Sequence, residues 1–189
     1  LAQRTGLDRV FFSDNGSTAV EVALKTAVQW WHNRGEPRLQ LVAFDGAYHG
    51  DTFGAMAVGA RSLFSEPFDP MLFPVRRIHW PHTHWNDGDV EASEQQALDQ
   101  LEQVLATPTA AVILEPLIQG AGGMRMVRPE FLRAVEQRVR HAGSLLIADE
   151  VLAGFGRCGR LLASQRAGIR PDLVALSKGL TAGFLPMGI

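Results

Sequence analysis

The sequence predicts an α/β fold, with a mainly parallel sheet flanked by helices, and three observations support this prediction. Short apolar runs alternate along the chain with amphipathic stretches of helical length, the order typical of parallel strands with helices on both faces. Hydrophobic residues make up 46% and charged residues 20% of the chain, which excludes an intrinsically disordered protein. A length of 189 residues is sufficient to bury a core without disulfide bonds.

Three stretches have the pattern of a helix. The first, residues 18–33, has apolar side chains near helical spacing, and Gly35 lies just past its end. The second, residues 90–105, is polar and helical in pattern. The third begins at Pro129 and runs to about residue 141, because proline is well suited to the first turn of a helix.

Four apolar runs are expected to form strands, at residues 39–44, 110–114, 144–148 and 173–177. Residues 59–89 hold four prolines and several aromatic side chains and are expected to be irregular. In sheets of this type, ligands bind beyond the carboxyl ends of the strands. The places to search for a functional site are therefore residues 45–50, residues 115–123, Asp149 with the residues after it, and Lys178.

Charge and cysteine content exclude several classes of protein. Eighteen basic and twenty acidic residues give a net charge of −2, so no basic field indicates a nucleic-acid or membrane partner. The longest apolar runs are far too short to cross a bilayer. A single cysteine, Cys158, excludes an intrachain disulfide and fits a reducing compartment, so we expect a cytoplasmic protein. The chain begins at Leu1 and ends within an apolar stretch, and we expect it to be a piece of a longer protein.

Two charged residues directly follow expected strands: Asp149 follows residues 144–148, and Lys178 follows residues 173–177. A lysine amine can form a Schiff base with an aldehyde, and a carboxylate can hold a pyridinium nitrogen protonated. Pyridoxal phosphate requires these two groups of a protein. The alternative is that both residues are ordinary strand-end charges, exposed to solvent or paired with each other.

Residues 13–18, Ser-Asp-Asn-Gly-Ser-Thr, precede the first helix and could hold a phosphate. Unpaired amides and the helix dipole attract anions at such a start, where Gly16 permits close approach and Ser17 offers a hydroxyl. Ordinary capping of the helix is the alternative. Tyr48 is the only tyrosine and lies in the search region, where its ring could stack on a planar cofactor or be half-buried in the core.

Three other patterns compete with this interpretation. Residues 154–159 match the Gly-x-Gly-x-x-Gly pattern of dinucleotide-binding proteins, but they do not lie between a strand and a helix. The spacing of His79, His82 and His84 could attract zinc, yet no cysteine lies near them, and we expect a surface loop without a metal. Cys158 has no partner that would make it a nucleophile and is expected to be structural or exposed.

Six short motifs fall in or near these regions: Asn15-Gly16-Ser17, Tyr48-His49-Gly50, Glu115-Pro116, Asp149-Glu150, Gly154-Phe155-Gly156-Arg157 and Ser177-Lys178-Gly179. In their order and spacing they resemble the class III, fold-type I pyridoxal-phosphate aminotransferases, over nearly the whole chain. The resemblance implies that residues 1–189 are the large domain that binds pyridoxal 5′-phosphate. This domain would be incomplete, with an amino-terminal segment and a carboxyl-terminal domain absent.

Two longer stretches, residues 48–56 and 119–125, resemble one branch of this family, and Asp51 carries much of the likeness. The likeness implies transfer of an amino group from S-adenosylmethionine to 8-amino-7-oxononanoate, which gives 7,8-diaminononanoate in biotin biosynthesis. The alternative within the family is an ω-amino acid or an ornithine-like donor. The resemblance also implies a homodimer with its active site at the subunit interface, so we expect this chain alone to be inactive.

The resemblance assigns roles to individual residues. Lys178 would hold the cofactor covalently and move a proton between the substrate carbon and the cofactor, and Asp149, as an ionised carboxylate, would bind the pyridine nitrogen. Asn15, Gly16 and Ser17 would hold the phosphate. The remaining contacts are Tyr48 beside the ring and the substrate, Val151 on the opposite face of the ring, and Asp51, Glu115 and Arg157 around the substrate.

Three positions depart from the family's usual pattern. Ala153 and Cys158 stand where threonine is frequent, and Ala182 stands where glycine is usual. None of them coincides with the lysine, the aspartate or the phosphate-binding residues, so we expect effects on packing and rate but not on the type of chemistry.

Overall fold

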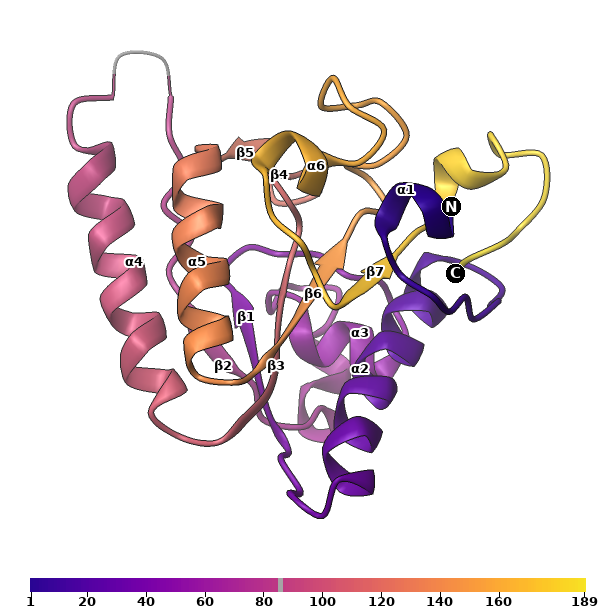
Figure 1. The fold of residues 1–189 in the computed structure, drawn as a ribbon, viewed down its shortest axis with the longest axis horizontal. Helices are drawn as coiled ribbons and strands as arrows, with labels where there is room; N and C mark the ends of the chain where they lie inside the picture. Colours follow the sequence, from indigo (N-terminus) through magenta and orange to yellow (C-terminus); the bar gives the residue numbers. More distant parts are fainter. Residues whose placement is uncertain (85–86) are drawn as a thin grey trace.

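The computed structural model describes residues 1–84 and 87–189 and has a five-stranded sheet at its centre (Figure 1). All neighbouring strands in this sheet are parallel, in the order β2-β1-β3-β6-β7, so the expected parallel sheet is confirmed. The strands are β1 (Gln40–Phe44), β2 (Arg76–Ile78), β3 (Thr109–Leu114), β6 (Leu145–Asp149) and β7 (Leu173–Ala175).

Helices cover both faces of the sheet and create two separate apolar cores (Figure 1). Val42 and Phe44 of β1 pack toward α4 and α5, whereas Leu41 and Ala43 pack toward α2 and α3. Successive side chains of a strand point to opposite faces, so a strand covered on both sides is a continuous apolar run in the sequence. The helices are α2 (Gly16–Asn33), α3 (Phe53–Val58), α4 (Val90–Leu105) and α5 (Pro129–His141).

Shorter elements connect the main ones and lie mostly near the carboxyl ends of the strands. Strands β4 and β5 form a small antiparallel hairpin that follows β3. These elements are α1 (Ala2–Thr5), η1 (Glu66–Met71), β4 (Ile118–Gln119), β5 (Arg125–Met126), α6 (Ala163–Ala167) and η2 (Lys178–Leu180).

The structure corrects several of the expected boundaries. Residues 59–89 are not wholly irregular, because they contain η1 and the edge strand β2, whose sequence Arg-Arg-Ile is not an apolar run. Helix α2 begins at Gly16, two residues earlier than expected, and β7 ends at Ala175 instead of residue 177. Asp149 is the last residue of β6 and does not follow it.

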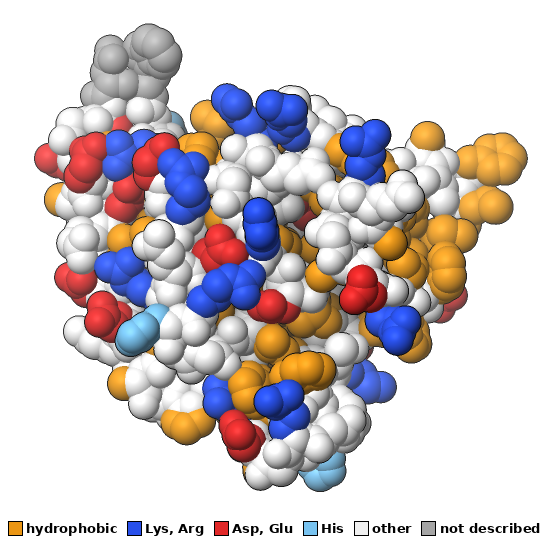
Figure 2. Space-filling model, viewed as in Figure 1, with side chains coloured by type: hydrophobic (Ala, Val, Ile, Leu, Met, Phe, Trp, Pro, Cys, Tyr) orange, Lys and Arg blue, Asp and Glu red, His pale blue; other side chains and the backbone are white. Residues whose placement is uncertain are grey.

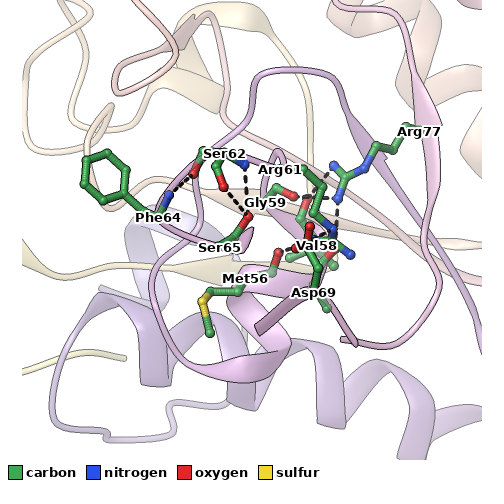
Figure 3. Close-up of polar contacts among 10 residues, drawn as sticks. Met56, Val58, Gly59, Arg61, Ser62, Phe64, Ser65, Asp69 and Arg77 are labelled. Atoms are coloured by element: carbon green, nitrogen blue, oxygen red, sulfur yellow. Dashed lines mark hydrogen bonds and ion pairs between the residues drawn. The ribbon is translucent and has the colours of Figure 1, made fainter. Parts of the chain in front are cut away.

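Two arginines fix the carboxyl end of α3 (Figure 3). Arg77 of β2 donates through Nη2 to the carbonyl oxygen of Ala57 at 3.0 Å, and Arg61 donates through Nη1 to that of Met56 at 2.9 Å. Arg61 also pairs with Asp69 at 3.3 Å. Burial is the main reason that the pKa of Arg77 is lowered, and the nearby Arg61 adds to it. The last carbonyls of a helix lack partners within it, so these contacts satisfy them and hold α3 against the sheet.

Charged side chains of both signs are intermixed over α4 and α5, as Figure 2 shows, while hydrophobic side chains gather beside the segments near the two chain ends. Large exposed hydrophobic residues of these segments include Phe11, Phe12, Phe184 and Leu185. Within the described residues, no helix is long and apolar enough to span a membrane.

Candidate active site

A cavity of 570 Å³ lies at the carboxyl edge of the sheet, where the residues after β1, β3, β6 and β7 meet. The chain leaves β1 for β2 on one side and later returns to β3 on the other, and a ligand crevice is expected where the strand order reverses in this way. Nine residues predicted from the sequence line it: Asn15, Gly16, Ser17, Tyr48, Asp51, Glu115, Asp149, Val151 and Lys178.

A larger groove of 830 Å³ follows the outer side of α2, and none of the predicted site residues lines it. Its lining is mainly apolar, with Glu21, Lys25, His32 and Arg38 as the charged or titratable groups. Glu21 is already bonded to the Thr52 hydroxyl at 2.6 Å. The smaller cavity, which collects the titratable groups at the strand ends, is therefore the candidate active site.

The amino terminus of α2 forms one end of the cavity. Asn15 caps the helix, because its Oδ1 accepts from the Thr18 amide at 3.0 Å while the Thr18 hydroxyl accepts from the Asn15 amide at 3.0 Å. Ordinary capping is thus the observed role of the Asn15 side chain. Within the described residues, the amides of Gly16 and Ser17 have no hydrogen-bond partner, so they can face an anion.

Gly16 is packed so closely that its lack of a side chain is necessary. A Cβ atom there would lie 2.8 Å from Cγ1 of Val151, closer than real Cβ contacts. Gly50 is equally constrained, because its φ is +124° and an added Cβ would clash with Oγ of Ser17. These two glycines let the loop after β1, the start of α2 and the loop after β6 converge on one point.

Tyr48 and Asp51 form a hydrogen-bonded pair at the cavity. The Tyr48 hydroxyl donates to Oδ2 of Asp51 at 2.8 Å, and the Asp51 amide donates to Oγ of Ser17 at 3.0 Å. Burial, followed by the hydrogen bond to Asp51, raises the pKa of Tyr48 to about 12. The phenol is therefore a stable donor near neutral pH. Its side chain is 44% exposed and lines the cavity, so it is available to a bound ligand.

Asp149 ends β6 at the floor of the cavity, and two donors hold its carboxylate. Oδ1 accepts from the Val151 amide at 3.0 Å, and Oδ2 lies 2.7 Å from Nδ1 of His49. Asp149 is 4% exposed and His49 is 3% exposed. A carboxylate held in this way can present its remaining lone pairs to a ligand in one orientation.

Glu115 follows β3 and lies between the loop that carries Tyr48 and the end of β6 that carries Asp149. Its carboxyl group accepts from the Tyr48 amide at 3.2 Å and from the Gly120 amide at 3.3 Å. Burial raises the pKa of Glu115 to about 7, while His49 opposes this rise and Asp149 adds to it. Glu115 can therefore exchange a proton near neutral pH.

Lys178 enters the cavity from the turn after β7, at the start of η2. Its backbone has a φ of +37°, a left-handed conformation that is uncommon for any residue other than glycine. Within the described residues, its side chain makes no ion pair and no hydrogen bond. Lys178 and Asp149 therefore line one cavity without being paired to each other, which argues against the simple strand-end pair.

The family model described as "Aminotransferase class-III" matches residues 1–189. The chain belongs to the class III aminotransferase family. It is 65% identical over 184 residues to the adenosylmethionine-8-amino-7-oxononanoate aminotransferase of Synechococcus elongatus, covering 97% of this chain and 43% of the relative. It is 45% identical over 190 residues to the enzyme of the same name from Geobacter sulfurreducens, covering 96% and 42%. The chain thus spans less than half the length of these relatives.

Solved structures support the same assignment of fold. An amine transaminase from an uncultivated Pseudomonas species, described in the PLP-bound (internal aldimine) form, matches with a TM-score of 0.90 and 37% identity, over 99% of this chain and 44% of that one. The adenosylmethionine-8-amino-7-oxononanoate aminotransferase of Methanocaldococcus jannaschii matches with a TM-score of 0.83 and 32% identity, over 96% and 41%. The expected partial fold-type I architecture is confirmed. That residues 1–189 are an incomplete large domain remains a prediction.

Arg157 is the one predicted site residue that the structure keeps out of the cavity. Its side chain is exposed, and Nε donates to the carbonyl oxygen of Leu152 at 2.7 Å. Residues 154–159 form turns, and the next helix begins only at Ala163, so the dinucleotide-binding alternative is excluded. A glycine-rich segment that does not begin a helix lacks the amide arrangement that dinucleotides require.

The remaining sequence patterns lie outside the cavity. His79 contacts the Ser93 hydroxyl at 3.1 Å, and His82 and His84 stack edge to face. No group of three possible metal ligands is found among the residues that the structure describes. Burial is the main cause of a raised pKa for the Cys158 thiol, a direction that disfavours a reactive thiolate.

The structure adds cavity residues that the sequence reasoning did not assign. The most important is His49, which lies in the loop after β1 and contacts Asp149. A signal existed, because His49 was within the search region, but nothing local links it to a residue 100 positions away. The other additions are Gly50, Thr52, Ala121, Leu152 and Ser177.

Proposed function

We propose that this chain forms the cofactor-binding part of a pyridoxal-phosphate-dependent aminotransferase. The observation that carries the proposal is the convergence, in one cavity, of the amino terminus of α2, the Asp149 carboxylate and the Lys178 side chain. The amino terminus of α2 comes from the first part of the chain, and ordinary charges at the ends of β6 and β7 would not require it to lie beside them.

The residues present fit pyridoxal phosphate. The amides of Gly16 and Ser17, which have no partner among the described residues, suit the phosphate, and the lack of a side chain at position 16 lets Val151 approach the same end of the cavity. Asp149 suits the ring nitrogen, and Lys178 suits the aldehyde. When bound, this cofactor supplies an electron sink for a carbanion at the substrate carbon.

The other residues of the chain have supporting roles in this proposal. Lys178 holds the cofactor and moves a proton at its Nζ, and Asp149 keeps the ring nitrogen charged. Tyr48 and Val151 border the ring on its two sides, and Val151 also packs against Gly16. Glu115 and Asp51 contact the substrate side of the cavity. Arg157 would need a change of rotamer, or the complete protein, to take part.

We infer that the substrates are S-adenosylmethionine as donor and 8-amino-7-oxononanoate as acceptor, which places the protein in biotin biosynthesis. The support is that the relatives at 65% and 45% identity both carry the name of that enzyme. The runner-up is a donor of the ω-amino acid class. It is favoured by the likeness to an (S)-enantioselective omega-transaminase from Thermomicrobium roseum, which has a TM-score of 0.85 and 32% identity.

We propose a homodimer in the cytoplasm as the working form. The chain covers 43% of its Synechococcus relative, and it exposes Phe64 at 91% and Phe184 at 86%. Apolar surface of this kind is costly unless another protein surface covers it. The chain by itself is expected to be inactive.

Borohydride trapping in the full-length protein tests the cofactor. The protein is mixed with pyridoxal phosphate, its visible spectrum is recorded, it is reduced, and the labelled lysine is found by peptide mass. This chain has two lysines, Lys178 and Lys25, and Lys25 is exposed on α2, so Lys25→Ala is the matched control. We expect a pyridoxyl adduct on Lys178 that survives in Lys25→Ala and is lost in Lys178→Ala. A folded wild-type protein without this adduct and without a visible cofactor band would refute the proposal.

A separate assay tests the substrates. S-Adenosylmethionine is supplied as the sole amino donor with 8-amino-7-oxononanoate, and 7,8-diaminononanoate is measured. If the protein traps the cofactor on Lys178 but forms no diaminononanoate, the proposal of an aminotransferase stands and S-adenosylmethionine is excluded as its donor. An ω-amino acid series would then identify the runner-up.

A further inference from the structure

His49 stands directly behind the carboxylate of Asp149. It lies in the loop after β1, whereas Asp149 ends β6, and β3 separates these two strands in the sheet. The imidazole therefore reaches across the end of β3, where Glu115 begins the next loop. Both side chains of the pair are almost fully buried: the exposed fraction of the side chain is 0% for His49 and 5% for Asp149. A contact that spans three strands at this depth is a feature of the folded sheet edge, not of a local turn.

The carboxylate of Asp149 is held from two directions. The Val151 amide binds Oδ1 at 3.0 Å from the same loop, and Nδ1 of His49 lies 2.7 Å from Oδ2. To bond a carboxylate, Nδ1 must carry its hydrogen, which fixes the state of this nitrogen. If His49 were absent, only the amide would hold the carboxylate, and the group could rotate about its last torsion.

The second ring nitrogen of His49, Nε2, indicates the role of the residue. Nε2 is buried, and it has no hydrogen-bond partner among the described residues. A histidine kept only to stabilise a core normally satisfies both nitrogens. Among the described residues, the His49 ring makes its hydrogen bond to Asp149 only.

We propose that His49 is a positioning residue that locks the Asp149 carboxylate toward the cofactor ring nitrogen, an inference that rests on the proposed function. Outer partners of this kind orient the group that makes the direct contact, and they are sensitive to substitution although they touch no substrate. His49 acts on the cofactor through Asp149. Its loss leaves the phosphate end of the cavity, at Gly16 and Ser17, unchanged.

The variants are chosen by the atom they place next to Oδ2. In His49→Asn, the amide nitrogen occupies about the place of Nδ1 and keeps a donor, whereas His49→Leu keeps apolar bulk and removes the donor. His49→Gln places its amide one bond farther out. His141, exposed at the end of α5, supplies the matched control His141→Asn.

Three quantities are measured for each full-length variant: the Kd for pyridoxal phosphate by equilibrium dialysis, kcat and KM at saturating cofactor, and the Tm of the cofactor-free protein. For His49→Leu we expect a rise in the cofactor Kd and a fall in kcat of about 10- to 100-fold each, with KM within about threefold. His49→Asn should recover most of both, and His49→Gln less. His141→Asn should match the wild type.

Two outcomes would overturn the role of His49. One is a His49→Leu protein with a lower Tm but wild-type Kd and kcat, which would make the histidine a packing residue only. The other, decisive if His49→Leu does not fold, is a set of equal Kd and kcat values for His49→Asn, His49→Gln and the wild type. Failure of the proposed function is recognised separately, because the wild type itself would then show no borohydride-fixed adduct on Lys178, and the role of His49 would fall with it.

Discussion

The contact between Gly16 and Val151 allows a prediction whose size can be worked out from the structure. Substitution of Gly16 by alanine would place Cβ 2.8 Å from Cγ1 and 3.2 Å from Cγ2 of Val151. The third neighbour, Cβ of Ser177 at 3.6 Å, is at an ordinary contact distance. The clash in Gly16→Ala is therefore with the two methyl groups of one side chain.

Two opposing terms decide the result. Forcing an extra methyl group into a packed site costs about 1–3 kcal/mol. Gly16 is the first residue of α2, and alanine in its place restricts the unfolded chain, which returns about 0.4–1 kcal/mol. We expect Gly16→Ala to lower the free energy of unfolding by about 1–2 kcal/mol. Val151→Ala removes both clashing methyl groups, so the double variant should regain most of that loss, with a coupling of about 1–2 kcal/mol.

The assay is urea unfolding of the full-length protein without cofactor, for the two single variants and the double variant. Gly88→Ala is the control, because an added Cβ at position 88 meets no described residue within 4 Å and its φ is not in the left-handed region. The control should change the free energy of unfolding by no more than about 1 kcal/mol in either direction. If the two substitutions prove simply additive, the steric account of Gly16 is wrong.

Four further predictions follow from single contacts. Between pH 4.5 and 7 the folded protein keeps Glu115 protonated while the unfolded chain ionises it, so stability should fall by about 3 kcal/mol as pH rises through this window; urea unfolding at several pH values should show a fall that is smaller by about this amount in Glu115→Gln, where Glu150, whose pKa is also raised by burial, still contributes. Asn15→Ala removes the capping box of α2 and should cost about 1 kcal/mol, measured as a lower urea midpoint. Glu150→Ala leaves the Ala163 and Ser164 amides, now bonded at 2.8 and 2.7 Å, without their buried acceptor and should cost about 2–4 kcal/mol, with increased proteolysis of residues 151–162. Ala182 has a φ of +53°, so Ala182→Gly should raise the thermal midpoint by relieving about 1 kcal/mol of strain, and an unchanged or lower midpoint would count against this.

The parallel sheet could be predicted because its strands are buried on both faces. Strand β3 is buried at all six positions, and α2 and α5 show their apolar faces at helical spacing. Periodicity of this kind is a local property of the sequence, so it can be detected without any knowledge of tertiary contacts. The rule that ligands bind beyond the carboxyl ends of strands then located the cavity.

The elements that were missed depend on contacts made across the fold. Strand β2 is three residues long and carries two arginines, and it exists because it pairs with β1 at the sheet edge. Helix α3 has six residues, and the Arg77 side chain from β2 caps its end. Neither the pairing nor the cap leaves a periodic pattern in the sequence. His49 was missed for the same reason, because its partner Asp149 is distant in the chain.

The strained backbone and the buried carboxyl groups of this fold are concentrated at the sheet edge that holds the cavity. Among the described residues, the non-glycine residues with positive φ are Leu117, Met124, Phe155, Lys178 and Ala182, and all of them lie in segments that follow β3, β6 or β7. Three buried carboxyl groups, those of Glu115, Asp149 and Glu150, lie at the same edge. The two apolar cores on the opposite faces of the sheet supply the stability that tolerates these strained and desolvated groups. Lys178 lines the cavity, and the other strained residues lie in the loops around it and not in the cores, so the strain marks a site that is held in place for binding and not a generally loose fold.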